Sequence, residues 1–127
     1  MTKRRVTILS GSTEWLLDQW GLWRMSGMGV PRYVSPAFAL MRDNVEQNTA
    51  PSFNITDEAA GLVDQAVARL GIRDSQMADC IWLYYGARYT QARVGRYLQI
   101  SETKAAQLIA AGVAWVDGRL ETIREAA

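Results

Sequence analysis

The residue types that carry most enzyme chemistry are missing or scarce in this sequence. Its 127 residues include no histidine, and Cys80 is the only cysteine. Zinc sites built from histidine and cysteine, histidine-dependent nucleophiles and disulfides are therefore excluded. Two carboxylate pairs remain, Asp57 with Glu58 in the first turn of an expected helix and Asp117 with Glu121 one turn apart on another. Solvated helix faces explain both pairs, so we expect a protein that is not an enzyme and has no cofactor or metal site.

A concentration of positive charge indicates a different chemistry. The whole chain has a formal net charge of only +1, but residues 88–104 contain four basic residues and one acidic residue. The preceding segment, residues 57–87, has an excess of acidic residues. A basic segment of this kind is where a polyanion such as double-stranded DNA is expected to bind.

The same segment has the pattern of a helix-turn-helix, at about residues 89–111. A short helix near 90–98 is followed by the three-residue break at 99–101 and then by a helix that Ser101 can cap. Gly95 supplies a small residue where the second helix must cross the first closely. The second helix can enter the major groove with its first turns, where side chains that avoid the apolar face can reach base edges. These side chains are Glu102, Thr103, Lys104 and Gln107.

Polar side chains on or before the first helix are expected to contact phosphates, which position the protein on DNA without reading its sequence. They are Arg88, Thr90, Gln91, Arg93 and Arg96. Two features depart from the usual pattern. Gln99 stands where such turns prefer a glycine with positive φ, and Glu102 would face phosphates unless it accepts a hydrogen bond from a cytosine. Short helices joined by three residues also occur in bundles that bind no DNA, so that alternative stays open at this point.

Helix-start and helix-stop residues along the rest of the chain predict an all-α fold of about six helices. The other spans expected are about 13–25, 36–47, 57–70, 74–85 and a long last helix from 102 to about 123. Residues 1–12 are expected to form a flexible basic arm, and residues 13–127 a single compact domain. No apolar run approaches the ~18 residues that a membrane helix needs, and a lone cysteine suits a reducing compartment. We therefore expect a cytoplasmic protein that does not bind a membrane.

The tryptophans divide into core candidates and one surface candidate. Trp20 and Trp23 share a helical stripe with Leu16, which predicts that they are buried. Trp15 lies off that stripe and is a candidate contact to a partner protein. Trp82, Trp115 and Cys80 are also expected to pack inside, although Trp82 lies one residue off the apolar face of its helix.

These motifs together resemble a known family. The run Trp-Leu-Leu-Asp-Gln-Trp-Gly-Leu-Trp at 15–23, the run Leu-Tyr-Tyr-Gly at 83–86, the helix-turn-helix and the long last helix are similar to the late-gene antitermination Q proteins of lambdoid phages. The similarity is closer to the group without a zinc ribbon than to the Q protein of phage lambda. It covers most of residues 13–123. The Tyr-Tyr-Gly stretch also resembles the DNA-reading C-terminal domain of bacterial sigma factors.

The resemblance implies a protein that binds a DNA element at a phage late promoter and joins a paused RNA polymerase holoenzyme. It would stay with the elongation complex, in the cytoplasm of the bacterial host, and make it read through pauses and terminators. In the zinc-free group a protein ring that narrows the RNA-exit channel would surround the nascent RNA, and a repeated DNA element would hold two copies. Applied to this chain, the resemblance makes Thr103, Lys104 and Gln107 the reading residues, with Arg88, Arg93 and Arg96 on phosphates.

Two other functions fit the same residues. One is a phage or prophage helix-turn-helix regulator that acts only at initiation. The other is a helical polymerase-binding protein without a DNA site.

Overall fold

The structure, a computed structural model, describes residues 9–26 and 53–126, with side chains as far as Arg124. Over these ranges the regular elements are all helical: α1 (Thr13–Met25), α3 (Asp57–Arg73), α4 (Ser75–Ile81), the π-helical segment η2 (Trp82–Gly86), α5 (Gln91–Leu98) and α6 (Glu102–Ala126). The prediction of an all-α fold with a long last helix is confirmed. None of these helices is long and apolar enough to cross a membrane. The helix expected at 36–47 lies outside the described residues.

Side-chain caps fix where the first helices begin. Ser12 caps α1, Thr56 caps α3 and Asp74 caps α4, and each accepts a hydrogen bond at 3.1 Å from the backbone N–H of the third helical residue. Each bond satisfies one of the N–H groups that a helix start leaves without a partner, which stabilises the helix by about 1 kcal/mol. Serine, threonine and aspartate are among the residue types that most often occupy this position.

The expected helix at 74–85 is confirmed as helical, but its last part has a different helix type. Its α-helical geometry stops at Ile81, and the chain continues to Gly86 as the wider π-helical turn of η2. The departure coincides with a tertiary contact, because Gly21 of α1 lies directly against the η2 backbone. A Cβ built at Gly21 would be 2.0 Å from the carbonyl oxygen of Tyr85. The spacing of apolar residues within one helix cannot predict a backbone contact with a segment so far away in the sequence, nor the π-helical turn found beside it.

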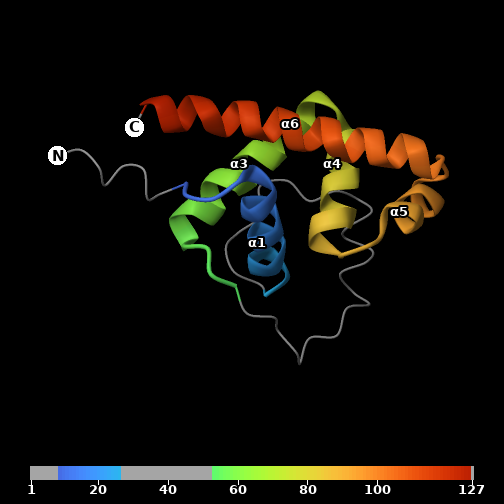
Figure 1. Cartoon of the computed structure of the whole chain (residues 1–127), viewed down its shortest axis with the longest axis horizontal. Coiled ribbons are helices and arrows are strands. Elements are labelled where there is room, and N and C mark those ends of the chain that lie inside the picture. Colours follow the sequence, from blue (N-terminus) through green and yellow to red (C-terminus); the bar gives the residue numbers. More distant parts are fainter. Residues whose placement is uncertain (1–8, 27–52, 127) are drawn as a thin grey trace.

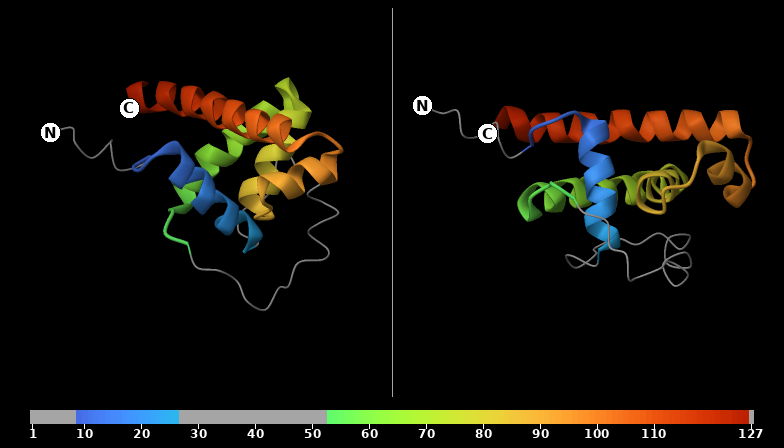
Figure 2. Two further views of the ribbon diagram at one scale, coloured as in Figure 1. Left: turned by 45° about the vertical axis from the view of Figure 1, so that its right-hand side comes forward. Right: turned by 60° about the horizontal axis from the view of Figure 1, so that its bottom comes forward.

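The long helix α6 lies across the other helices (Figure 1). Its 25 residues make it about 37 Å long. It packs against α1, α3, α4 and α5, and α4 packs against α3 while η2 packs against α1. The second view of Figure 2 shows α1, α3 and α5 on the same side of α6. The α4–η2 rod therefore lies in the middle of the fold, with packed helices around it.

Aromatic rings and one buried ion pair fill the core between α1, α3 and η2. Trp20 and Trp82 are fully buried and meet edge to face, with ring centroids 4.9 Å apart. The Trp20 indole N–H donates to the Asp64 carboxylate at 3.0 Å, and that carboxylate also pairs with buried Arg24 at 3.4 Å. Of the side chains expected inside, the structure buries Trp20, Trp23, Trp82 and Cys80 and half-buries Trp115.

The start of α1 is fastened to the end of α6. Leu9 is buried, and the Arg124 guanidinium donates at 3.4 Å to the backbone carbonyls of Leu9 and Gly11. The Thr13 hydroxyl donates to the carboxylate of Asp117. Leu9 of the expected N-terminal arm is thus buried against the domain and Gly11 is hydrogen-bonded to it, while residues 1–8 lie outside the described part of the chain.

Candidate nucleic-acid interface

The interface begins at the capped start of α5. The Thr90 hydroxyl accepts a hydrogen bond at 3.1 Å from the backbone N–H of Arg93. Thr90 itself has extended backbone geometry, with φ −73° and ψ 164°, as a residue that precedes a helix should. The cap places α5 one residue after the position expected from the sequence, and it leaves Thr90 and Arg93 exposed while Gln91 is half-buried.

The turn after α5 has the geometry of a Schellman motif. The N–H of Ile100 donates to the Gly95 carbonyl at 2.9 Å, and the N–H of Gln99 donates to the Arg96 carbonyl at 3.3 Å. Gln99 has φ 62° and ψ 44°, the left-handed conformation. The sequence predicts a positive φ at this position, and the structure confirms it although the residue is glutamine rather than glycine.

Gly95 lets the two helices of the motif approach closely. A Cβ at Gly95 would lie 2.8 Å from the Ile100 carbonyl oxygen and 3.2 Å from the carbonyl carbon of Ser101. Both atoms belong to backbone, so a larger residue would have to push the start of α6 away from α5. The predicted close crossing is confirmed, and it sets the angle at which α6 leaves the turn.

The start of α6 presents the side chains expected to read bases. Ser101 caps the helix by accepting a hydrogen bond at 3.0 Å from the N–H of Lys104. On one side of the helix Ala105 and Ile109 are buried against the core. The four side chains proposed for base reading are all exposed: Glu102, Thr103, Lys104 and Gln107. The break at Ser101 and the exposure of these side chains are the two geometric conditions that base reading requires.

Aromatic rings that the sequence interpretation did not assign to the interface support its arginines. The guanidinium of Arg93 lies over the ring of Tyr89, 4.0 Å from its centroid, and Tyr97 meets the same ring edge to face at 6.2 Å. Tyr89 is buried and Tyr97 is 37% exposed. The stack holds Arg93 in one orientation, as cation–π contacts do. The signal in the sequence is an aromatic residue four positions on either side of Arg93.

Arg88 is placed differently from the other proposed phosphate contacts. Its guanidinium pairs with Asp18 of α1 at 2.6 Å and also donates to the Tyr85 carbonyl at 3.3 Å. Its φ of 65° is left-handed. Arg88 is also exposed, but it joins the end of η2 to α1 through an ion pair, whereas Arg93 and Arg96 of α5 take part in none of the ion pairs within the described residues. The structure places Gln91, Arg93 and Arg96 on α5 with Thr90 as its cap, and it places Arg88 in the segment between η2 and α5.

The candidate partner contact Trp15 lies apart from this interface. It belongs to the first turn of α1, and α4 lies between α1 and α5 (Figure 1). Its side chain is 38% exposed. The ring packs against Gly11, whose φ is 96° and where a Cβ would lie 2.8 Å from the Trp15 ring. The expected exposure of Trp15 is confirmed, and its contact with a partner stays a prediction.

Electrostatics at the interface favour an anion. Residues 80–101 contain no aspartate or glutamate, so Glu102 is the first carboxylate after η2. The exposed charges of α5 and the start of α6 are therefore three positive ones, on Arg93, Arg96 and Lys104, and one negative one, on Glu102. Within the described residues there is no group of three side chains that could hold a metal ion. The arrangement can bind an extended anion.

Comparison with known proteins agrees with this geometry. The family model described as phage antitermination protein Q matches residues 12–126. No curated protein and no solved structure matches the chain. The match runs from the cap of α1 to the end of α6, so it includes the core and the helix-turn-helix, and the chain belongs to the phage antitermination protein Q family.

Proposed function

We propose that this protein is a phage antitermination factor that recognises a DNA element at a late promoter through α5 and α6. Its family consists of phage transcription regulators rather than enzymes. The observation that carries the DNA-binding part is the exposure of four polar side chains at the capped start of α6. A helix start of this kind fits the major groove, where base edges are readable.

The hydrogen-bond donors and acceptors of each exposed side chain suit particular bases. Lys104 suits the O6 and N7 acceptors of guanine, and Gln107 suits the N7 acceptor and N6 donor of adenine. Glu102 can accept from the N4 amine of cytosine, and Thr103 can bond to several bases. On α5, Arg93 and Arg96 supply phosphate contacts that hold the protein in register without reading sequence.

The proposal continues from DNA to the polymerase. Bound beside a late promoter, the protein loads onto a paused RNA polymerase holoenzyme and remains on the elongation complex in the host cytoplasm. It makes the polymerase ignore pauses and terminators by narrowing the RNA-exit channel. The physical reason is steric, since a terminator stem is wider than the single strand that a narrow channel admits. Two copies act together where the DNA element is repeated, and Trp15 is one contact to the polymerase.

Salt-dependent DNA binding tests the division of roles between the two helices. Lys104→Ala should weaken binding by ~1 to 3 kcal/mol at one base position, and Arg93→Ala should weaken all sequences about equally and lower the log–log salt slope by about one. Arg69→Ala is the matched control, because Arg69 is an exposed cation on α3 outside the interface. Equal losses on specific and unrelated DNA for both interface variants would contradict the assignment.

Transcription from a late-promoter template with a downstream intrinsic terminator tests the antitermination part. We expect readthrough that depends on the DNA element and is lost in Lys104→Ala. A change in promoter strength without readthrough would favour a regulator of initiation. Polymerase binding without any sequence-specific DNA complex at low salt would favour a helical polymerase-binding protein with no DNA site.

A further inference from the structure

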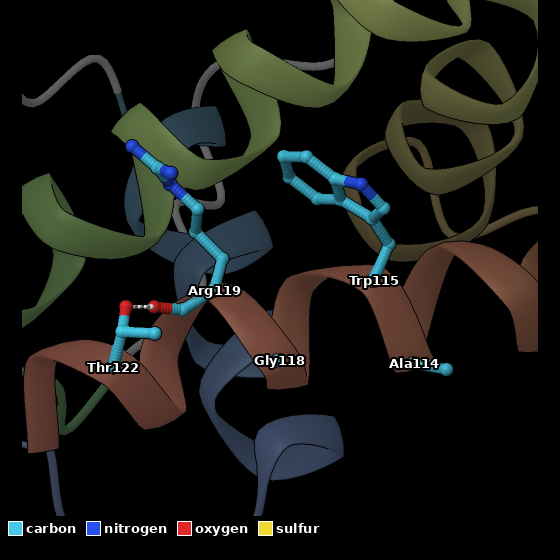
Figure 3. A pocket seen from close by; sticks show the side chains of 5 residues that line it. All are labelled: Ala114, Trp115, Gly118, Arg119 and Thr122. Carbon is cyan, nitrogen blue, oxygen red and sulfur yellow. Dashed lines mark hydrogen bonds between the residues drawn. The ribbon is translucent and has the colours of Figure 1, made fainter. Parts of the chain in front are cut away.

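A groove on α6 lies well away from the DNA-reading end of that helix. It has a volume of about 360 Å³ and is lined by one face of the helix: Ala114, Trp115, Gly118, Arg119 and Thr122. Figure 3 shows the side chains of Trp115 and Arg119 rising from α6 on the same side, with Gly118 between them. A Cβ at Gly118 would meet no atom within 4 Å, so the floor of the groove is open.

The charges around this groove leave Arg119 as its available cation. Asp117 accepts a hydrogen bond from Thr13 and lies 3.8 Å from Arg124. Glu121 also pairs with Arg124, at 3.4 Å. Both acidic neighbours are therefore engaged with other groups, whereas Arg119 is exposed and takes part in none of the ion pairs within the described residues.

The residue types at the groove fit a protein partner better than a nucleic acid. Tryptophan, tyrosine and arginine are the residues that most often dominate binding at protein interfaces. Trp115 is half-buried against the core and lines the groove. Residues 110–124 contain two basic and two acidic residues, which gives no net attraction for a polyanion, in contrast to residues 88–104.

We propose that this groove is a docking site for an RNA polymerase surface that inserts an apolar side chain beside Trp115 and places a carboxylate against Arg119. The inference deepens the proposed function, on which it rests, by naming a surface for the polymerase. Trp115 lies eleven residues after Lys104, about 16 Å along the helix axis. That separation allows α6 to hold DNA at its first turns and a protein at its middle at the same time.

Filling the groove tests the proposal without disturbing the fold. Gly118→Leu places a side chain in open space and replaces a residue of low helix propensity, so stability should be kept or raised. Gly61→Leu on α3 is the matched control, because a Cβ there also meets nothing within 4 Å. Arg119→Glu reverses the available charge, and Arg69→Glu is its control on α3.

Binding of purified RNA polymerase holoenzyme and core enzyme is measured for these variants beside DNA affinity. We expect Gly118→Leu and Arg119→Glu to weaken polymerase binding about tenfold or more, with DNA affinity unchanged and both controls like the wild type. Wild-type polymerase affinity in both groove variants overturns the docking site alone. The docking site is also overturned if Gly118→Leu and Arg119→Glu lose self-association or RNA binding while their polymerase affinity stays that of the wild type. A wild-type protein that binds no polymerase overturns the docking site together with the polymerase part of the proposed function, while DNA binding still reports on the other part.

Discussion

The left-handed turn residue Gln99 offers the sharpest test of the helix-turn-helix geometry. Gln99 has φ 62° and is exposed, so its side chain gains little from packing. Its backbone N–H makes one of the two bonds that close the turn. A glycine at this position keeps that bond and removes the steric conflict between Cβ and the carbonyl oxygen. We therefore expect Gln99→Gly to stabilise the protein.

The size of the effect follows from two opposing terms. A left-handed conformation costs an L-residue roughly 1–2 kcal/mol, and glycine removes this cost from the folded state. Glycine also stabilises the unfolded state by about 0.5–1 kcal/mol, because its backbone has more conformational freedom there, and this opposes the gain. The net gain in the free energy of unfolding is about 0.5–1 kcal/mol. With an unfolding entropy of about 2.1 cal/mol/K per residue, a chain of 127 residues should show a Tm increase of about 2–4 °C.

Thermal and urea unfolding measure this gain, with two controls that separate strain from side-chain loss. Gln99→Ala removes the same side chain but keeps the strain, so its Tm should not rise. Arg88→Gly relieves a φ of 65°, but it also removes the 2.6 Å ion pair with Asp18 and a bond to the Tyr85 carbonyl. Its gain should therefore be smaller than that of Gln99→Gly. A lower Tm for Gln99→Gly, or a larger gain at Arg88, would refute the reasoning.

Three other perturbations have expected outcomes. Gly21→Ala should destabilise the fold by about 3 kcal/mol, because its Cβ would lie 2.0 Å from the Tyr85 carbonyl oxygen. A Tm within 2 °C of the wild type would contradict that contact. Asp64→Ala should also cost about 3 kcal/mol in urea unfolding, since it removes the partner of buried Arg24, and a loss below about 1 kcal/mol would count against a stabilising pair. Burial, with smaller contributions from neighbouring carboxylates, raises the pKa of the Cys80 thiol to about 11. Iodoacetamide at pH 8 should therefore leave the folded protein unlabelled and label the urea-unfolded chain, and equal labelling rates would disagree with a buried thiol.

Local sequence predicts the helix starts well because a cap is a short-range interaction. Ser101 bonds to a backbone N–H three residues ahead, as expected from its place before the last helix, and Ser12, Thr56 and Thr90 make the same kind of bond, which fixes the starts of their helices to within one residue of the expected positions. The exposure of Lys104 is equally predictable, because a helix with a buried stripe leaves its other positions in solvent. These features are the ones that define the candidate interface.

Contacts between distant segments are not predictable from local patterns. Arg88 pairs with Asp18, seventy residues earlier in the chain, and nothing in the helix-turn-helix pattern indicates that it is engaged there. Trp82 lies one residue off the expected apolar face, yet it is 1% exposed because α4 and η2 have packed helices around them. One apolar stripe is the wrong criterion from Ala78 to Gly86, because no residue of that stretch is exposed.

The two motifs that carry the family resemblance meet in the structure. Gly21, within the tryptophan run of α1, lies against the backbone of Tyr85 in the Tyr-Tyr-Gly run of η2, and Trp20 packs on Trp82 just before it. These residues are buried, so the motifs indicate a hydrophobic core that family members have in common, and they do not indicate which DNA sequence a member binds. The residues that would choose a DNA element lie elsewhere, on the exposed start of α6, where packing places no demand on residue type. Two members of the family can therefore share the core motifs and still read different elements, and exchanging Glu102, Thr103, Lys104 and Gln107 between such members should exchange element preference without changing the fold.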